Sequence, residues 1–471
     1  MKLAHKIFIN GNFVSPQGND IMEIVNPANE KLIGEVALGN EQDALAAIAS
    51  AKRALPAFAQ TARHQRQYYL QRLHDTIIAR LEDLKEATIE EYGATVQRAR
   101  WSNHYAAETF LLFKELLGEY EFEKTISKSK LIMQPVGVTA IFTAWNANAG
   151  SICVKLAAAI AAGCTVVIKP SEMSALQTKI LMECFAEAGL PPGVINVVNG
   201  RGDVLGPVLS THPDVARVTF TGSTAIGKII ARNAIDTMKR MTLELSGKSP
   251  NIILDDADLS SAIPMAVNEC FQNNGQACVA GSRLIVPKKL LPEIRQLVIE
   301  IVRAMKVGDP RDERTTIGPL ASEKQYQRIQ HYIRVGIEEG AELLIGGEGK
   351  PDGLSKGYYV KPTVFVNVTP TMTIAREEIF GPVLSILTYE TEDEAVQMAN
   401  DTVFGLQAYI SSTNMERANK IAAQIDAGRV SLNTMTHDPL APFGGFKQSG
   451  IGREGGIFGL EQQLEPKVIL N

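Results

Sequence analysis

Cys278 and Glu244 are the two residues whose types and surroundings could carry out chemistry together. Cys278 lies between Gly275 and Gly281 in an amide-rich segment, and Glu244 precedes it in the run Leu243–Lys248. A loop of small residues can expose a thiol, and a nearby carboxylate can act as a base. A free cysteine is more often a small buried hydrophobe, but a core strand would not carry these glycines and amides. The pair therefore predicts covalent thiol chemistry completed by an activated water.

Two further segments have the composition of nucleotide-binding turns. Val166–Glu172 ends an apolar run with Lys169 and then Glu172, which could hold phosphate or ribose oxygens at the carboxyl edge of a parallel sheet. Phe220–Gly227 follows another strand-like run and opens a helix, whose first N–H groups favour an anion. Alone, the first segment is better explained by a surface ion pair, and the second differs from the GxGxxG fingerprint. Each is a weak signal by itself.

Alternating strand-like and helix-like segments must position these residues. From residue 137 to 235, short apolar runs alternate with amphipathic ones, and a second series of this kind runs from about 251 to 433. Such alternation predicts βαβ units and mostly parallel sheets. We therefore expect two α/β domains joined near residue 246.

The flanking segments have other patterns. Residues 42–55, 62–92 and 94–117 have the apolar spacing of helices. Lys130–Val136 and Glu465–Leu470 are expected to be isolated strands. Strands at such places either pair across a subunit interface or form simple edge strands.

The composition excludes several classes of protein. At 471 residues the chain is too long for one compact core, and a net charge of −5 without a basic run offers no footprint for nucleic acid. The five cysteines form no CxxC pair, which fits reduced thiols in the cytoplasm. The seven histidines have no zinc-site spacing, so we expect no metal. No apolar stretch reaches the roughly 18 residues of a membrane span, so we expect no membrane partner.

Seven motifs, in order along the chain, resemble those of the aldehyde dehydrogenase superfamily, in its NAD(P)-dependent, hydrolytic and non-acylating form. The resemblance extends from about residue 7 to residue 470. The motifs are Thr143–Ala147, Lys169–Glu172, Phe220–Thr224, Leu243–Lys248, Gly275–Cys278, Glu377–Pro382 and Pro442–Gly450.

The resemblance implies an α/β fold with three parts. These are a Rossmann-type dinucleotide-binding domain (1–117 and 138–245), an α/β catalytic domain (246–455) and a small β oligomerisation arm (118–137 and 456–471). An arm of this kind implies a homodimer or homotetramer.

The resemblance also implies a reaction, the oxidation of a small-molecule aldehyde to the carboxylic acid with NAD as hydride acceptor. Cys278 attacks the aldehyde carbon, and the amide of Asn146 holds the oxyanion of the thiohemiacetal. Water deprotonated by Glu244 then hydrolyses the thioester, and Lys155 supports the site. The implied cofactor-binding residues are Thr143, Ala144, Trp145, Lys169, Ser171, Glu172, Gly200, Gly222, Ser223, Thr224, Leu245, Glu378 and Phe380.

Two glutamates discriminate among related activities. Members that transfer the acyl group to coenzyme A lack a glutamate at the position of Glu244, so its presence favours hydrolysis. Glu172 would repel a 2′-phosphate and favours NAD, with NADP as an alternative cofactor. The competing interpretations are a coenzyme A-acylating dehydrogenase, an NADP-preferring semialdehyde dehydrogenase and a non-catalytic binding protein on the same fold.

Departures from the family pattern concern the substrate. An aromatic position of the pattern is Ala147 here, Asn148 replaces a proline, and Ser246 stands where glycine is usual. The expected pocket residues are Ala147, Ser151, Val154, Gln272, Ala277, Val279 and Phe443, from a loop at 433–443. Because they are mostly small or polar, we expect an aldehyde bulkier or more polar than acetaldehyde.

Overall fold

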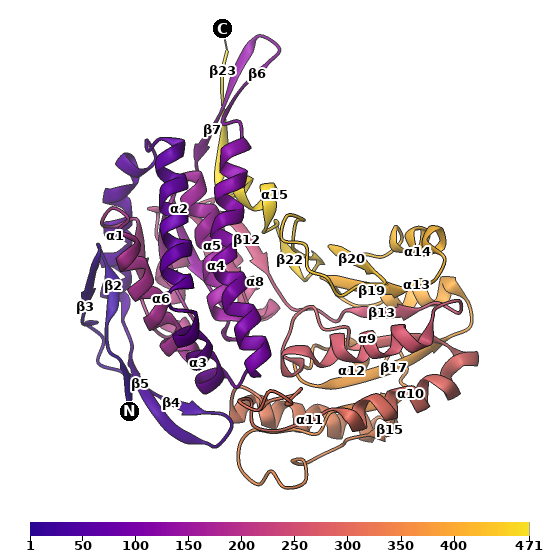
Figure 1. Cartoon of the computed structure of the whole chain (residues 1–471). Helices are drawn as coiled ribbons and strands as arrows, with labels where there is room; N and C mark the ends of the chain where they lie inside the picture. The colour runs from indigo at the N-terminus through magenta and orange to yellow at the C-terminus, as the bar shows by residue number, and fades with distance from the viewer. Residues whose placement is uncertain (471) are drawn as a thin grey trace.

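The computed structural model describes residues 1–470 and shows two α/β halves with a protruding β-arm (Figure 1). The predicted α/β fold is therefore confirmed. No helix within these residues is long and apolar enough to cross a membrane.

The first half is built on an eight-stranded sheet. Its central five strands, in the order β12-β11-β8-β9-β10, are parallel, and three short strands flank them. The chain runs outward from β8 to β10 and then returns to place β11 on the other side of β8, so the strand order reverses between β8 and β11. In spatial order the strands are β22 (Gly450–Ile451), β12 (Arg240–Glu244), β11 (Val215–Thr221), β8 (Val138–Phe142), β9 (Thr165–Lys169), β10 (Ile195–Val197), β2 (Ile7–Ile9) and β3 (Asn12–Val14).

Eight α-helices belong to this half, and their apolar faces form its core. The predicted helix over 62–92 is two helices, because Arg80 leaves the helical conformation with φ −114° and ψ 16°. The helices are α1 (Glu41–Phe58), α2 (Arg63–Ile78), α3 (Leu81–Tyr92), α4 (Val96–Glu119), α5 (Asn148–Ala162), α6 (Ala175–Ala188), α7 (Gly202–Thr211) and α8 (Thr224–Ile235). Nearly every residue of α5 is buried, which makes it the central helix of the largest apolar cluster.

The second half contains a seven-stranded sheet that is parallel except for β15. In spatial order its strands are β15 (Glu342–Ile345), β16 (Thr363–Val366), β17 (Val383–Tyr389), β14 (Arg283–Pro287), β13 (Pro250–Ile253), β19 (Gln407–Ser411) and β20 (Arg429–Leu432). Its helices are α9 (Leu259–Phe271), α10 (Leu291–Ala304), α11 (Glu323–Glu338), α12 (Thr373–Arg376), α13 (Glu392–Asn400) and α14 (Met415–Ala422). Here the strand order reverses between β13 and β19.

The arm is a separate three-stranded sheet in the order β23-β7-β6 (Figure 1). The two strands expected to stand outside either core pair with each other in antiparallel fashion, from Leu464 opposite Pro135 to Ile469 opposite Lys130. The arm strands are β6 (Glu123–Ile126), β7 (Ser129–Pro135) and β23 (Leu464–Ile469), and α15 (Gly456–Glu461) leads into β23. The remaining strands are β1 (Lys2–Ala4), β4 (Ile21–Asn26), β5 (Lys31–Ala37), β18 (Phe404–Gly405) and β21 (Phe446–Lys447).

Candidate active site

A cleft of about 1680 Å³ lies between the two halves. One wall is formed where β8, β11 and β12 end, and the other where β14, β19 and β20 begin. The carboxyl edge of the first sheet therefore faces the amino edge of the second. Ligands of open α/β sheets bind outside the carboxyl ends of strands where the strand order reverses, and the β8/β11 reversal opens onto this cleft.

Cys278 is presented by a tight loop that leaves α9 and enters β14. The short 3₁₀ helix Gln272–Gly275 turns the chain with positive φ at Asn273, Asn274 and Gly275. A side chain at Gly275 would lie 2.2 Å from the carbonyl carbon of Gly381, and one at Gly247 would lie 2.3 Å from the Cys278 carbonyl oxygen. These close backbone contacts fix the loop, which explains why the motif requires glycine.

The Cys278 thiol is half-buried, whereas the other four cysteines are buried. Burial and the negative charges of Glu378 and Glu244 raise the pKa of Cys278 to about 12, although the N–H groups of Cys278 and Val279 act to lower it. The sulfur is therefore protonated at neutral pH. A base must remove the proton before the sulfur can act as a nucleophile.

Glu244 ends β12 and is buried in the wall of the same cleft. Neither of its carboxylate oxygens has a hydrogen-bond partner among residues 1–470. Burial and the neighbouring Glu454 raise its pKa well above the ordinary value. A buried carboxylate without partners is unfavourable to folding, and a raised pKa makes it a stronger base than an ordinary glutamate.

Lys155 does not point into open space but forms a buried ion pair. Its Nζ lies 2.6 Å from Oε1 of Glu454 and 2.7 Å from the hydroxyl of Thr221. Glu454 also accepts a hydrogen bond from Thr219 at 3.0 Å. The pair lines the cleft beside Glu244, and Glu454 was not predicted from the sequence.

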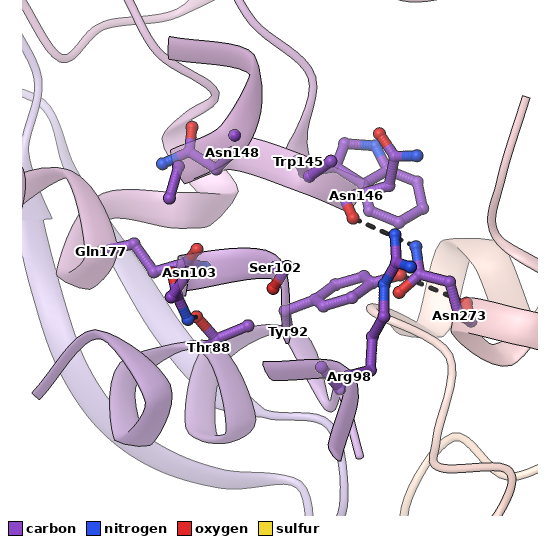
Figure 2. A pocket seen from close by; sticks show the side chains of 14 residues that line it. Thr88, Tyr92, Arg98, Ser102, Asn103, Trp145, Asn146, Asn148, Gln177 and Asn273 are labelled. Atoms are coloured by element: carbon purple, nitrogen blue, oxygen red, sulfur yellow. Dashed lines mark hydrogen bonds between the residues drawn. The ribbon is translucent and has the colours of Figure 1, made fainter. Parts of the chain in front are cut away.

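Asn146 lies in the short 3₁₀ helix Trp145–Ala147, directly after β8. Its side-chain amide donates a hydrogen bond to the Gln276 carbonyl at 3.0 Å. Its own carbonyl accepts a hydrogen bond from the side chain of Asn273 at 3.1 Å (Figure 2). Both partners belong to the loop that presents Cys278. The two predicted residues Asn146 and Cys278 are thus fixed to each other across the cleft.

Most of the predicted cofactor residues line the cleft. Those that do are Ala144, Trp145, Gly222, Ser223, Thr224, Leu245, Glu378 and Phe380. Glu378 accepts a hydrogen bond from the N–H of Gly247 at 3.1 Å. Phe380 has a left-handed backbone with φ +66°, and its ring packs edge-on against Trp145 at 5.4 Å. Strained backbone of this kind is common in binding sites.

Thr143, Lys169, Ser171, Glu172 and Gly200 do not line the cleft but continue along the same sheet edge, after β8, β9 and β10. Lys169 and Glu172 form an ion pair at 2.8 Å. An ion pair between these two residues was also an interpretation of the sequence, but it was expected at the surface, whereas Lys169 is buried at the sheet edge where a nucleotide would lie.

The edge fits an extended dinucleotide. Ser223 caps α8, its side chain accepting the N–H of Ile226, and Gly222 approaches the Phe220 ring so closely that a side chain would lie 2.4 Å away. The N-terminus of α8 therefore offers N–H groups to an anion without a side chain in the way.

All seven predicted pocket residues line the cleft. The hydroxyl of Ser151 is buried and has no partner among the described residues. Gln272 donates a hydrogen bond to Glu269, so its amide is held to one side of the cleft. Ser246 is buried, and its carbonyl accepts a hydrogen bond from Ser449 at 2.6 Å.

Comparison with known proteins decides the family. The model of the aldehyde dehydrogenase family matches residues 13–469, nearly the whole chain. The chain belongs to the aldehyde dehydrogenase family. The resemblance seen in the seven sequence motifs is therefore confirmed.

Relatives of this aldehyde dehydrogenase cover its full length. The chain is 43% identical to a 3-succinoylsemialdehyde-pyridine dehydrogenase of a Pseudomonas species, over 100% of this chain and 99% of that protein. A cysteine-to-alanine mutant of aldehyde dehydrogenase C from Pseudomonas syringae was solved with NAD+ and octanal. It matches with a TM-score of 0.98 at 43% identity, over 99% of this chain and 96% of that one. Betaine aldehyde dehydrogenase from Staphylococcus aureus, solved with NAD+, matches at 0.96 and 35% identity, over 99% and 94%.

The cleft of this aldehyde dehydrogenase also contains residues that sequence reasoning missed. They are Arg98, Trp101, Tyr105, Glu269, Tyr409, Arg429 and Glu454, whereas His437, which also lines the cleft, belongs to the loop that was predicted at 433–443. None belongs to one of the motifs, and they come from α4, α9, β19, β20 and the segment after β20. No local signal marks them, because only the packing of distant elements brings them together.

Proposed function

We propose that this aldehyde dehydrogenase oxidises its substrate through a thioester on Cys278 that water activated by Glu244 hydrolyses. One observation carries the proposal. The thiol shares a cleft with a buried carboxylate that has no partner among the described residues and whose pKa is raised well above its usual value. A structural carboxylate would be paired, whereas a general base must be free to accept a proton.

The proposed reaction begins with the loss of the thiol proton. Glu244 accepts it, and the sulfur of Cys278 bonds to the aldehyde carbon. The amide of Asn146 and the N–H of Cys278 stabilise the resulting oxyanion. Bound NAD would supply the acceptor for the hydride of this carbon, whose loss leaves the thioester on Cys278. Glu244 then releases its proton to solvent and deprotonates a water that attacks the thioester. The bond between the acyl carbon and the Cys278 sulfur breaks, the carboxylic acid departs, and the proton on Glu244 returns to the sulfur.

The cofactor is NAD, and we propose how the sheet edge holds it. Lys169, Ser171, Glu172 and Gly200 would contact the adenosine portion, with Glu172 on the ribose hydroxyls. The N–H groups at the start of α8, behind Gly222, Ser223 and Thr224, would hold the pyrophosphate. Thr143, Ala144, Trp145, Leu245, Glu378 and Phe380 would surround the nicotinamide end. Because Lys169 neutralises part of the charge of Glu172 at 2.8 Å, we expect a preference for NAD over NADP rather than strict exclusion.

The width of the pocket supports a substrate larger or more polar than acetaldehyde. Ala147, Ser151 and Val154 form one wall, and their small side chains leave room near Cys278. We expect kcat/KM for benzaldehyde and for longer or hydroxylated aldehydes to exceed that for acetaldehyde. A higher value for acetaldehyde would contradict this expectation.

We also propose that the β-arm (118–137 and 456–471) joins subunits into a dimer or tetramer and extends from domains 1–117 with 138–245 and 246–455. Ile126, Val468 and Ile469 of the arm are more than two-fifths exposed. A partner subunit would cover these apolar side chains. The five unpaired cysteines fit a cytoplasmic location.

A product assay tests the proposed reaction. The purified chain is incubated with NAD and benzaldehyde, with and without coenzyme A, and products are identified by mass spectrometry. We expect NADH and free benzoate in equal amounts in both samples. Benzoyl-coenzyme A would instead establish an acylating enzyme, and no NADH with any aldehyde would favour a non-catalytic protein.

A further inference from the structure

Arg98 is a cation without a hydrogen-bonding partner in the wall of the substrate cleft. It lies in the first turn of α4, is half-buried, and lines the cleft together with Cys278. Its guanidinium lies over the Trp101 ring, 4.5 Å from the centroid. Within residues 1–470 it forms neither an ion pair nor a side-chain hydrogen bond.

Two other buried or half-buried cations of the cleft, Lys155 and Arg429, have hydrogen-bonding partners. Lys155 is paired with Glu454 at 2.6 Å. Arg429 donates to the carbonyls of Pro442, Asp438 and Ala441 and contacts His437, so its guanidinium is fully used to hold the 433–443 segment. Among the three, Arg98 alone has all of its side-chain donors free.

The surroundings make this charge unfavourable in the absence of an anion. Burial lowers the pKa of Arg98. The side chain also stands at the positive end of the α4 dipole, whose first turn contains no acidic residue. A free guanidinium of this kind has the fork geometry that binds a carboxylate through two parallel hydrogen bonds.

Glu269 is the acidic residue of the cleft whose charge acts on Arg98. Glu269 does not neutralise the guanidinium. The two form no ion pair, and Oε1 of Glu269 accepts hydrogen bonds from Tyr409 at 2.5 Å and from Gln272. Burial raises the pKa of Glu269 to about 7, so its charge is partial at neutral pH. The anion that completes the Arg98 site must therefore come from a ligand.

The position of Arg98 in the cleft indicates what kind of ligand would supply this anion. Figure 2 shows its side chain extending toward Trp145, Asn146 and Asn273, and these three residues line a pocket with it. Asn146 is the proposed oxyanion donor and lines the same cleft as Arg98, so a molecule whose aldehyde is bound at Asn146 can reach Arg98 with its other end. Beside Arg98, the stacked rings of Trp101 and Tyr105, 5.5 Å apart and 6° from parallel, line the cleft and offer apolar contact to the stem of the molecule.

We propose that the substrate is an aldehyde with a carboxylate at its far end, and that Arg98 binds this carboxylate. The proposal rests on the proposed function, because it takes Cys278 and Asn146 as the place of the aldehyde. It makes Arg98 the residue that determines specificity for acidic over neutral aldehydes.

Pairs of acidic and neutral aldehydes with similar shapes test whether Arg98 binds a substrate carboxylate. kcat/KM is measured with NAD for 4-carboxybenzaldehyde and 4-formylbenzamide, which differ in charge but hardly in shape, and for the aliphatic pair succinic semialdehyde and butanal. We expect acid-to-neutral ratios well above one in the wild type for at least one pair. In Arg98→Met that ratio should fall about 100-fold, the effect of losing charge-assisted hydrogen bonds, and Arg98→Lys should keep an intermediate ratio.

Arg100→Met is the control, because Arg100 is on the same helix but is exposed and paired with Glu313. It should leave the ratio unchanged. Wild-type ratios near one for both pairs, or equal ratios in the wild type and Arg98→Met, would overturn the inference while aldehyde oxidation stands. Failure to oxidise any of the four aldehydes, together with benzaldehyde, would instead count against the proposed function.

Discussion

The two sheets of this molecule share one topological feature and use it differently. Each sheet has a point where the strand order reverses, between β8 and β11 in the first and between β13 and β19 in the second. Such points are where α/β sheets bind ligands. In the first sheet the reversal opens onto the cleft that contains Cys278 and Glu244, whereas in the second it is filled by the protein's own side chains.

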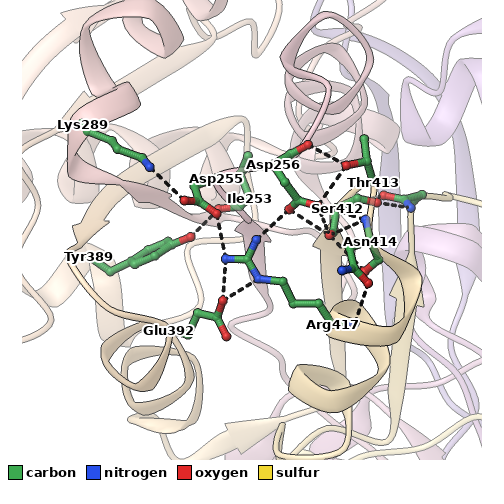
Figure 3. A network of polar contacts seen from close by, with 11 residues as sticks. Ile253, Asp255, Asp256, Lys289, Tyr389, Glu392, Ser412, Thr413, Asn414 and Arg417 are labelled. Atoms are coloured by element: carbon green, nitrogen blue, oxygen red, sulfur yellow. Dashed lines mark hydrogen bonds and ion pairs between the residues drawn. The ribbon is translucent and has the colours of Figure 1, made fainter.

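The side chains at the second reversal form a polar network around Asp256, which follows the end of β13 (Figure 3). Asp256 accepts hydrogen bonds from the hydroxyls of Ser412 and Thr413, from the N–H of Asn414 and from Arg417, all at 2.8–3.0 Å. Burial acts to raise the pKa of Asp256, but these hydrogen bonds and the charge of Arg417 outweigh it and lower the pKa.

Glu244, at the end of a strand of the first sheet, lacks the hydrogen bonds that Asp256 receives. Its oxygens have no partner among the described residues, and its pKa is raised well above the ordinary value. The difference teaches that a paired carboxylate at a sheet edge holds the fold together, whereas an unpaired one is available for chemistry.

Loss of the nucleophile should have the largest effect. Cys278→Ala removes the thiol that lines the cleft, so aldehyde-dependent NADH formation should fall by about 10⁴-fold or more, to background. The measurement is absorbance at the NADH band with benzaldehyde. Rapid turnover in this variant would place the nucleophile elsewhere.

Loss of the proposed base, Glu244, should have the second-largest effect on activity. Glu244→Gln should lower steady-state kcat by about 10³-fold, the effect of a general base in a hydrolytic step. Its melting temperature should match or exceed that of the wild type, because the variant no longer buries an unpaired carboxylate. A variant that is destabilised yet active would mean that Glu244 has a structural role like that of Asp256.

The pH dependence of thiol labelling tests whether Cys278 is protonated at neutral pH. Since the pKa of Cys278 is about 12, the thiolate fraction is small at neutral pH. The rate of modification by iodoacetamide should rise about tenfold per pH unit between pH 7 and 9. Mass spectrometry should locate the adduct on Cys278, since the other four thiols are buried. A rate that is flat over this range would show a thiol already ionised.

The smallest effect on activity should come from the second sheet. Asp256→Asn weakens charge-assisted hydrogen bonds, so we expect a loss of ~2 kcal/mol and a fall in melting temperature of about 3 °C. The lowered pKa means that this stabilisation is present at neutral pH and is lost as acid protonates Asp256. kcat/KM should stay within about twofold of the wild type.

Asp352→Asn is the matched control for this change. Asp352 is exposed and forms no hydrogen bond or ion pair within residues 1–470, so its replacement should leave the melting temperature unchanged. A catalytic defect in Asp256→Asn without a loss of stability would contradict the contrast between the two sheets.

Much of the fold and site could be predicted from sequence because the signals are local. The alternation of strands and helices follows hydrophobic periodicity, and Cys278, Glu244 and Asn146 lie in contiguous motifs. The break between α2 and α3 was missed because no glycine or proline marks Arg80. Nor could sequence reveal that Glu454 pairs with Lys155, 299 positions away, because that contact depends on tertiary packing.

The most direct test of the central claim is a rapid-quench experiment on Glu244→Gln with NAD and benzaldehyde. Without Glu244 only the small equilibrium fraction of Cys278 thiolate can attack, whereas hydrolysis has lost the base that activates water, so about one NADH per active site should appear slowly and a benzoyl group should accumulate on Cys278. Mass spectrometry of the quenched protein detects this adduct. Steady turnover at the wild-type rate without an accumulated adduct would contradict the account.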